Sequence, residues 1–102
     1  MSNTLILQPS VVGHGCKPDQ EPWQPNEGET VFIINESGST QELLDIKNKC
    51  LKTLNGKKKT SIKLKDGKSW KGKAGDKRNI GTYVYDDGES AAGPRNGHID
   101  PS

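Results

Sequence analysis

Apolar residues along the chain gather in short runs that are typical of strands. Residues 30–35, Thr-Val-Phe-Ile-Ile-Asn, contain four apolar side chains without alternation, which indicates a strand covered on both faces or central to a sandwich. Residues 3–8 and 80–86 carry further apolar runs, and Pro9 is suited to end the first of them. The pattern therefore predicts one buried central strand and two further strands nearer the ends of the chain.

Residues 40–54 are expected to form the one helix of the chain. Four apolar side chains recur at steps of three and four, the spacing of one helix face: Leu43, Ile46, Cys50 and Leu54. Ser39 and Glu42 have the spacing of a capping box, in which hydroxyl and carboxylate each accept a hydrogen bond from an exposed backbone N–H. Gly56 is a suitable terminator. The alternative for this segment is a pair of short strands, over which the cap and the order of charges favour the helix.

The segment 59–73 is predicted to be a lysine-rich hairpin. Its first half alternates, with Ile62 and Leu64 on one face and lysines on the other, and residues 68–73 alternate again. Asp66-Gly67 between the halves is the dipeptide favoured in a type I′ turn, where both central residues need positive φ. Such a hairpin presents lysines from both strands.

The remaining segments are expected to be irregular. Residues 13–28 contain three glycines and three prolines and predict a surface loop, from which Trp23 folds back as a lid on the core. Residues 87–102 predict an irregular tail with at most a short edge strand around residues 98–99. Together the elements predict one domain over residues 1–102 that is mainly β, a small sandwich of about six or seven strands with one helix.

Positive charge is concentrated in one part of the chain. The segment 47–78 holds thirteen of the fifteen basic residues and two of the thirteen acidic ones, so it carries 13 − 2 = +11. The formal net charge of the whole chain is +2, and the remaining residues therefore carry 2 − 11 = −9. With 28% hydrophobic residues the core is lean, so the charged segment is the feature that suggests a function.

We expect the lysine-rich hairpin to be the functional surface of a non-enzymatic binding module. It would contact a protein partner or an anionic surface through seven residues: Lys63, Lys65, Lys68, Trp70, Lys71, Lys73 and Arg78. The alternative is a nucleic-acid-binding domain that uses the same face, with lysines on phosphates and Trp70 stacked on a base. Against that alternative, only one of the thirteen cations is arginine, the residue suited to bidentate recognition.

No motif for catalysis or for a cofactor stands out. Four soft metal ligands are available, His14, Cys16, Cys50 and His98, but they lack the cysteine spacing typical of zinc sites, and we expect neither a metal nor a cofactor. A hydrolase built on Cys16 and His98 is the weakest of the three functional classes, because no flanking signature surrounds the cysteine. The two cysteines either form one disulfide or stay reduced, as is usual in the cytoplasm.

The first residues predict a cytoplasmic protein. They contain no basic segment, and the apolar run at residues 5–7 is too short for a signal peptide or a membrane span. Export by a route that reads no cleavable signal is the alternative.

Two stretches resemble parts of a cupredoxin-like or immunoglobulin-like β-sandwich. Residues 25–32 lead into residues 35–39 as a glycine turn that feeds a buried strand ending at an asparagine. Residues 81–85, Gly-Thr-Tyr-Val-Tyr, are similar to the strand near the end of cupredoxins. The resemblance implies that fold without its copper site: the ligand cysteine would stand at Asp87, and the ligand methionine is missing, since the only methionine is Met1.

Overall fold

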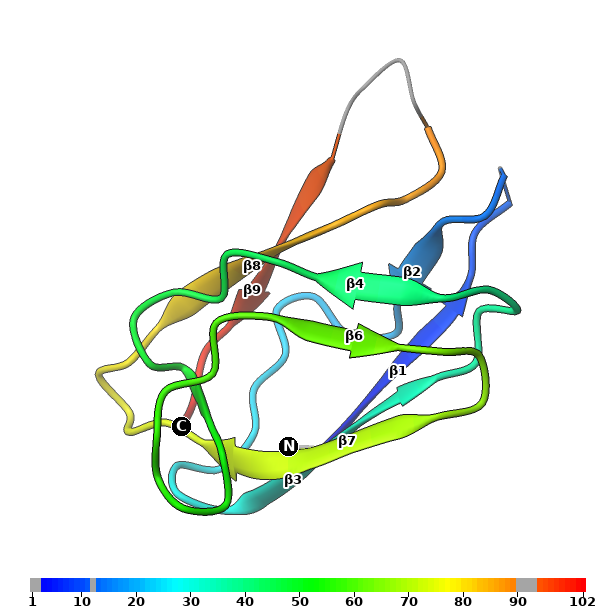
Figure 1. Cartoon of the computed structure of the whole chain (residues 1–102). Helices are drawn as coiled ribbons and strands as arrows, with labels where there is room; N and C mark the ends of the chain where they lie inside the picture. Colours follow the sequence, from blue (N-terminus) through cyan, green and yellow to red (C-terminus); the bar gives the residue numbers. More distant parts are fainter. Residues whose placement is uncertain (1–2, 12, 90–93) are drawn as a thin grey trace.

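The computed structural model describes residues 3–11, 13–89 and 94–102, which form strands and loops without a helix (Figure 1). Nine strands are present in this described part of the chain: β1 Thr4–Pro9, β2 Cys16–Pro18, β3 Thr30–Asn35, β4 Gln41–Leu43, β5 Leu51–Lys52, β6 Ile62–Leu64, β7 Ser69–Ala74, β8 Gly81–Tyr85 and β9 Arg95–Ile99. The predicted mainly-β class is confirmed. Among the same residues, no helix is long and apolar enough to cross a membrane.

The strands form the two layers of a sandwich. One layer is a five-stranded sheet in the order β2-β1-β3-β7-β5, in which β1 runs parallel to β3 and the other neighbours are antiparallel. The second layer consists of the pairs β4-β6 and β8-β9. Two reciprocal backbone hydrogen bonds between Leu44 and Val84, of 2.9 and 2.8 Å, join these pairs. The predicted sandwich is confirmed, with β3 central in the larger sheet.

The core lies between the layers and is filled by alternate residues of each strand. On β3, Val31 and Ile33 are fully buried, whereas Phe32 and Ile34 face outward and are half-buried. The strand is thus central in its sheet but covered completely on one face only. Trp23, predicted to fold back from its loop onto the core, is fully buried and pairs with β9, which confirms that prediction.

The helix predicted for residues 40–54 is wrong, and short strands take its place. β4 and β5 occupy this segment, and between them Asp45, Asn48 and Lys49 have left-handed backbones with φ of 50°, 61° and 56°. A right-handed helix cannot pass through such residues. Ser39, the expected cap, instead donates its hydroxyl to a carbonyl oxygen of the loop before β2 at 2.7 Å. Leu43, Ile46 and Cys50 are buried along this turning chain, whereas Leu54, the last residue of the apolar spacing, is 48% exposed.

The hairpin predicted for residues 59–73 is also wrong, because its two strands lie in different layers. β6 pairs with β4, whereas β7 pairs with β3 and β5. The turn between them is closed by a hydrogen bond of 3.0 Å from the Lys68 N–H to the Lys65 carbonyl oxygen. Of its two central residues, Gly67 has positive φ and Asp66 does not. Asp66-Gly67 therefore carries the chain from one layer to the other.

Two segments predicted to be irregular also contain strands. β2 lies within residues 13–28 and pairs with β1, and β9 lies within residues 87–102 and pairs with β8 over its full length. The strand β9 is hard to predict from the sequence because it contains Gly97, and glycine is unusual inside strands. In the structure a Cβ at residue 97 would lie 2.1 Å from Cζ of Tyr83, so glycine is the residue that lets the tyrosine ring cover this strand.

Asn35 ties the two layers together at the end of β3. It is fully buried, and Nδ2 donates to the carbonyl oxygens of Ser39 at 2.8 Å and Leu64 at 2.9 Å, while Oδ1 accepts from the backbone N–H and the hydroxyl of Ser37. Its backbone N–H and carbonyl oxygen bond to the turn that joins the layers. One residue thus fixes β6, the chain after β3 and the turn before β7.

Replacing Asn35 with alanine is expected to lower the free energy of unfolding by roughly 3 kcal/mol or more, because several buried groups lose their partners together. Urea denaturation measures this difference. Asn55 is exposed in the turn after β5 and provides a matched control, for which Asn55→Ala should change the value by less than about 0.5 kcal/mol. Equal losses for both variants would contradict the role given to Asn35.

Candidate functional site

The seven residues expected to bind a partner do not form one surface. Lys71 and Lys73 point outward from β7 on the five-stranded sheet, whereas Lys63 points outward from β6 on the other layer. The outer faces of a sandwich look in opposite directions, so these lysines cannot contact one small epitope together. Lys65 and Lys68 are exposed in the turn that joins the layers.

Trp70 lies on the core side of β7, and Arg78 lies beyond the end of that strand. Because side chains alternate along a strand, Trp70 packs against the core while Lys71 faces solvent. The indole covers Gly72, where a Cβ would lie 2.2 Å from Cη2 of the tryptophan. Arg78 is exposed in the loop between β7 and β8. The structure therefore separates Trp70 from the lysines with which the sequence grouped it.

The outer face of the five-stranded sheet brings lysines and apolar side chains together. We use this name for six residues that the register sets side by side: Ile6, Phe32, Ile34, Lys52, Lys71 and Lys73. Phe32 lies opposite Lys71, whose Nζ is 5.8 Å from the centroid of the phenyl ring. A cation at this distance is attracted to the ring face. Ile6 and Ile34 are neighbours in the adjoining parallel ladder.

Negative charge is absent from the strands of this face. None of the outward-pointing residues of β1, β2, β3, β5 and β7 is Asp or Glu, and the structure describes all of these strands. The ion pairs found among the described residues involve Arg95 and His98, and none of them involves a lysine. Lys52, Lys71 and Lys73 therefore form no ion pair with a described residue.

Sequence reasoning missed the apolar part of the outer face. The uninterrupted run in β3 hides which side chains point outward, because Phe32 and Ile34 look like their buried neighbours Val31 and Ile33. The signal that could separate them is the pairing of Phe32 with Lys71, which becomes visible only once β7 is known to lie beside β3. Alternation assigns faces reliably only when the partner strand is known.

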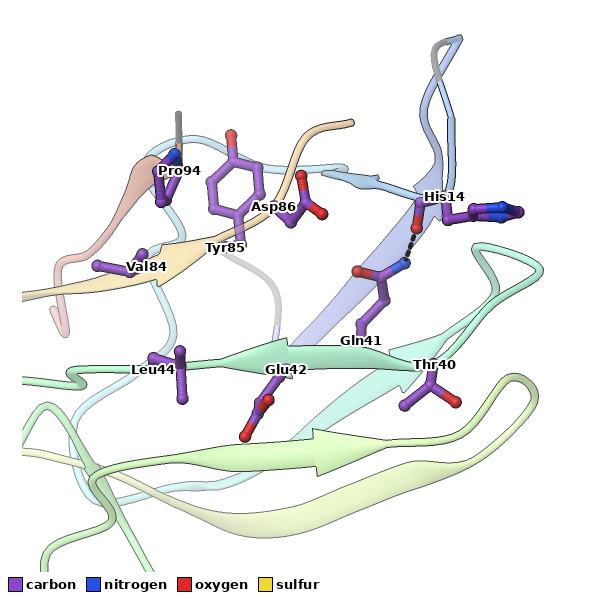
Figure 2. Close-up of a pocket in the computed structure, with 9 residues that line it drawn as sticks. All are labelled: His14, Thr40, Gln41, Glu42, Leu44, Val84, Tyr85, Asp86 and Pro94. Carbon is purple, nitrogen blue, oxygen red and sulfur yellow. Dashed lines mark hydrogen bonds between the residues drawn. The ribbon is translucent and has the colours of Figure 1, made fainter. Parts of the chain in front are cut away.

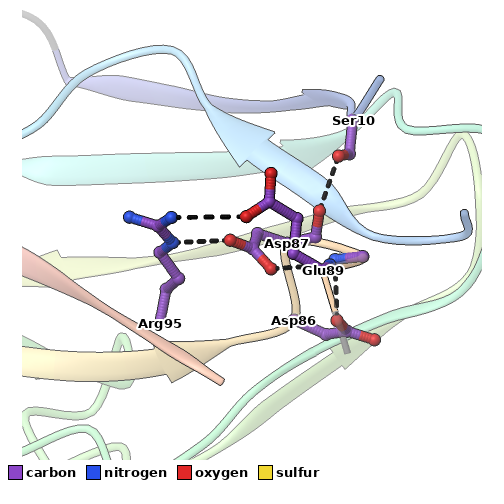
Figure 3. A network of polar contacts seen from close by, with 6 residues as sticks. Ser10, Asp86, Asp87, Glu89 and Arg95 are labelled. Atoms are coloured by element: carbon purple, nitrogen blue, oxygen red, sulfur yellow. Dashed lines mark hydrogen bonds and ion pairs between the residues drawn. The ribbon is translucent and has the colours of Figure 1, made fainter. Parts of the chain in front are cut away.

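An acidic turn follows β8, where the resemblance to cupredoxins places a copper-ligand cysteine. Asp87 occupies that position, and its Oδ2 lies 2.5 Å from Nε of Arg95, which also contacts Glu89 (Figure 3). The Ser10 hydroxyl donates to the Asp87 carbonyl oxygen. The hydrogen bond from the Glu89 N–H, followed by the contact with Arg95, lowers the pKa of the Asp87 carboxyl below its ordinary value. An ion pair thus fixes the turn where a copper site needs a thiolate.

The side chains of the described residues do not fit a copper site. In this part of the chain no group of three or more His, Cys, Asp or Glu residues is placed to hold a metal ion. Of the soft ligands noted in the sequence, Cys16 and Cys50 are buried free thiols, and Nδ1 of His98 lies 2.9 Å from Oε1 of Glu21. His14 is exposed beside β2. The structure does not bring these four ligands together.

Both cysteines are free and buried, one in β2 and one just before β5. Burial, followed by the nearby carboxylates of Asp86 and Asp87, raises the pKa of the Cys16 thiol from 9.0 to about 12. Burial likewise raises the pKa of Cys50 to about 11. Because the thiolate is the reactive form of cysteine, these shifts oppose a nucleophilic role for Cys16 near neutral pH.

Alkylation of the native protein at pH 8 is expected to be very slow at both cysteines. Relative to a thiol of pKa 9.0, Cys16 holds about a thousandth of the thiolate, and its reactivity rises only as pH approaches the raised pKa. Iodoacetamide labelling located by mass spectrometry measures the rate at each cysteine, with the urea-denatured protein as control. Labelling of native Cys16 at the denatured rate would contradict its placement.

Comparison with known proteins establishes the fold and no more. No family model matches the chain, and no curated protein matches it. A solved structure described as "Novel Purple Cupredoxin from Nitrosopumilus maritimus" superposes with a TM-score of 0.62 at 16% identity, over 97% of this chain and 98% of that chain. The domain therefore has a cupredoxin-like β-sandwich fold, as the resemblance in the sequence implied.

Proposed function

We propose that this domain is a non-enzymatic binding module that takes an acidic protein partner on the outer face of its five-stranded sheet. The observation that carries the proposal is the register, which sets Ile6, Phe32 and Ile34 beside a row of lysines on strands without outward Asp or Glu. The surface is narrower than the one expected from the sequence, since the lysines of β6 and of the turns are left out of it.

The make-up of the outer face suits a protein ligand. Protein interfaces combine an apolar centre with a polar rim, and complementary charge at the rim guides association and selects the partner. Ile6, Phe32 and Ile34 are half-buried and offer an apolar centre, and Lys71 and Lys73 form a positive rim along β7. A partner whose apolar patch is bordered by Asp and Glu would complement both parts.

A nucleic acid is the alternative ligand for the same face, and two features weigh against it. The cations of the outer face are all lysines, which lack the bidentate geometry that arginine offers to phosphates and bases. Ile6 and Ile34 offer no stacking surface, and the half-buried ring of Phe32 already has Lys71 over it. The face therefore matches an acidic protein better than a chain of bases.

Removing two charges from the outer face is expected to weaken partner binding about five- to tenfold, because two rim cations are lost. The variant is Lys71→Ser with Lys73→Ser. Its matched control is Lys63→Ser with Lys65→Ser, which removes the same charge from the opposite layer and the turn. Both variants change exposed residues only, and circular dichroism checks that each stays folded.

The measurement is capture by the tagged domain from extracts of its own host, followed by titration of each captured protein against the two variants. The proposal requires an acidic partner whose binding falls with the β7 variant and not with the control. An equal effect of both variants would contradict it. Salt-dependent retention of a mixed-sequence oligonucleotide, lost in the β7 variant, would replace the protein partner by the nucleic-acid alternative.

A further inference from the structure

A cleft of about 340 Å³ opens between β4 and β8, in the layer opposite the outer face (Figure 2). The ladder between these strands holds at Leu44 and Val84 and does not continue, because the carbonyl oxygen of Asp86 accepts from the Cys16 N–H at 2.8 Å instead. The strands therefore separate, and Gln41 and Asp86 line the gap. The cleft is large enough for a small organic molecule.

Gln41 is held in one orientation at the wall of this cleft. Its side chain is buried, with 4% exposed, and Nε2 lies 2.8 Å from the His14 carbonyl oxygen, 2.9 Å from Oγ of Ser37 and 3.0 Å from Oγ of Ser39. A backbone carbonyl can only accept, so the contact with His14 requires the amide nitrogen on that side. The amide oxygen is thereby turned away from His14 toward the cleft (Figure 2).

Among the described residues, none donates a hydrogen bond to the amide oxygen of Gln41. All three hydrogen bonds of this side chain to described residues are made by Nε2, and none by Oε1. This oxygen is not sealed from solvent, since the buried polar atom that lacks a partner among the described residues is the Tyr83 hydroxyl. An acceptor that is fixed in orientation and open to a cavity is suited to bind a donor from a ligand. The site is thus ready to receive an N–H or O–H group.

The rest of the cleft selects for positive charge and a short apolar body. Asp86 contributes a carboxylate to the lining, whereas the Glu42 side chain points to the opposite side of β4 from Gln41 (Figure 2). No Lys or Arg is among the described residues that line the cleft. Leu44, 41% exposed, and Tyr85 supply apolar and aromatic surface. His14 contributes its carbonyl oxygen, while its ring points away from the cleft (Figure 2).

We propose that this cleft binds a primary ammonium or guanidinium group carried on a short apolar chain. The N–H groups donate to Gln41 Oε1, the charge lies near Asp86, and the chain packs on Leu44 and Tyr85. A metal ion is a poorer match, since no three His, Cys, Asp or Glu side chains among the described residues are placed to hold one. The same chemistry could come from a free amine or from a Lys or Arg side chain of a peptide.

Binding is tested by titrating the ¹⁵N-labelled protein with n-butylguanidinium and n-butylammonium and following amide chemical shifts. We expect shifts at residues 41–44 and 84–86, with a Kd of about 1 mM or tighter. n-Butanol tests the apolar chain alone, and tetramethylammonium tests charge without an N–H donor. Neither compound should change the amide chemical shifts of these residues at the same concentration.

Single variants test which residues hold the cation. Asp86→Asn should weaken binding roughly threefold or more, because the carboxylate charge is lost. The asparagine keeps an oxygen that can accept the hydrogen bond from the Gly88 N–H, as Asp86 does. Glu36→Gln, an exposed carboxylate that does not line the cleft, is the control and should leave the Kd unchanged. Gln41→Met removes the amide oxygen and should weaken binding of both cations. The amide spectrum of this variant is compared with that of the native protein to check that it stays folded.

Three outcomes would overturn the proposal: no cleft shifts with either cation up to about 10 mM, an equal response to n-butanol, or an unchanged Kd in the Asp86→Asn variant. A blocked tripeptide, Ala-Arg-Ala, distinguishes the two sources of the cation. Tighter binding of the peptide than of n-butylguanidinium supports a side chain of a partner, and equal or weaker binding supports a free small molecule.

Discussion

The hydrogen bonds of Asn35 are the constraint on which the arrangement of the layers depends. The side chain joins β3 to the carbonyl oxygen of Leu64 in β6, and the backbone of the same residue holds the turn at 65–68. Because that turn is docked on the end of β3, the chain leaving β6 must cross to the other layer before it pairs again. A lean core of this size gains much from such a fully satisfied buried polar group, since each partner would be costly to leave unpaired.

The crossing determines how charge is distributed over the molecule. A hairpin would have gathered the lysines of residues 59–73 on one surface. The turn at residues 65–68 instead leads from one layer to the other, and the lysines are divided between the two layers. What remains together on the five-stranded sheet is a smaller set, Lys52, Lys71 and Lys73, beside Phe32 and its apolar neighbours. The +11 of the segment 47–78 is therefore spread around the molecule, and part of it adjoins the apolar side chains of the outer face.

Local patterns in the sequence predicted those parts of the fold that depend on local forces. The strand at 30–35 and the burial of Trp23 follow from apolar content and are as predicted. The segment 40–54 was predicted wrongly, because a spacing of three and four also arises when a chain turns through left-handed residues such as Asn48 and buries the side chains between the turns. Asp66-Gly67 identified a turn, but a turn dipeptide does not say whether the strands beside it pair with each other or with other strands.

The candidate sites were predictable to different degrees for the same reason. Lysines can be counted in a sequence, so part of the outer face was found, but its apolar half required the register between β3 and β7. Gln41 carries no signal in the sequence, because its role arises from contacts with residues 14, 37 and 39 that fix its amide. Among the residues that the structure describes, no cluster is placed to hold a metal ion, and Arg95 forms an ion pair with Asp87. The same fold thus carries an ion pair at the position where the resemblance to cupredoxins places a thiolate.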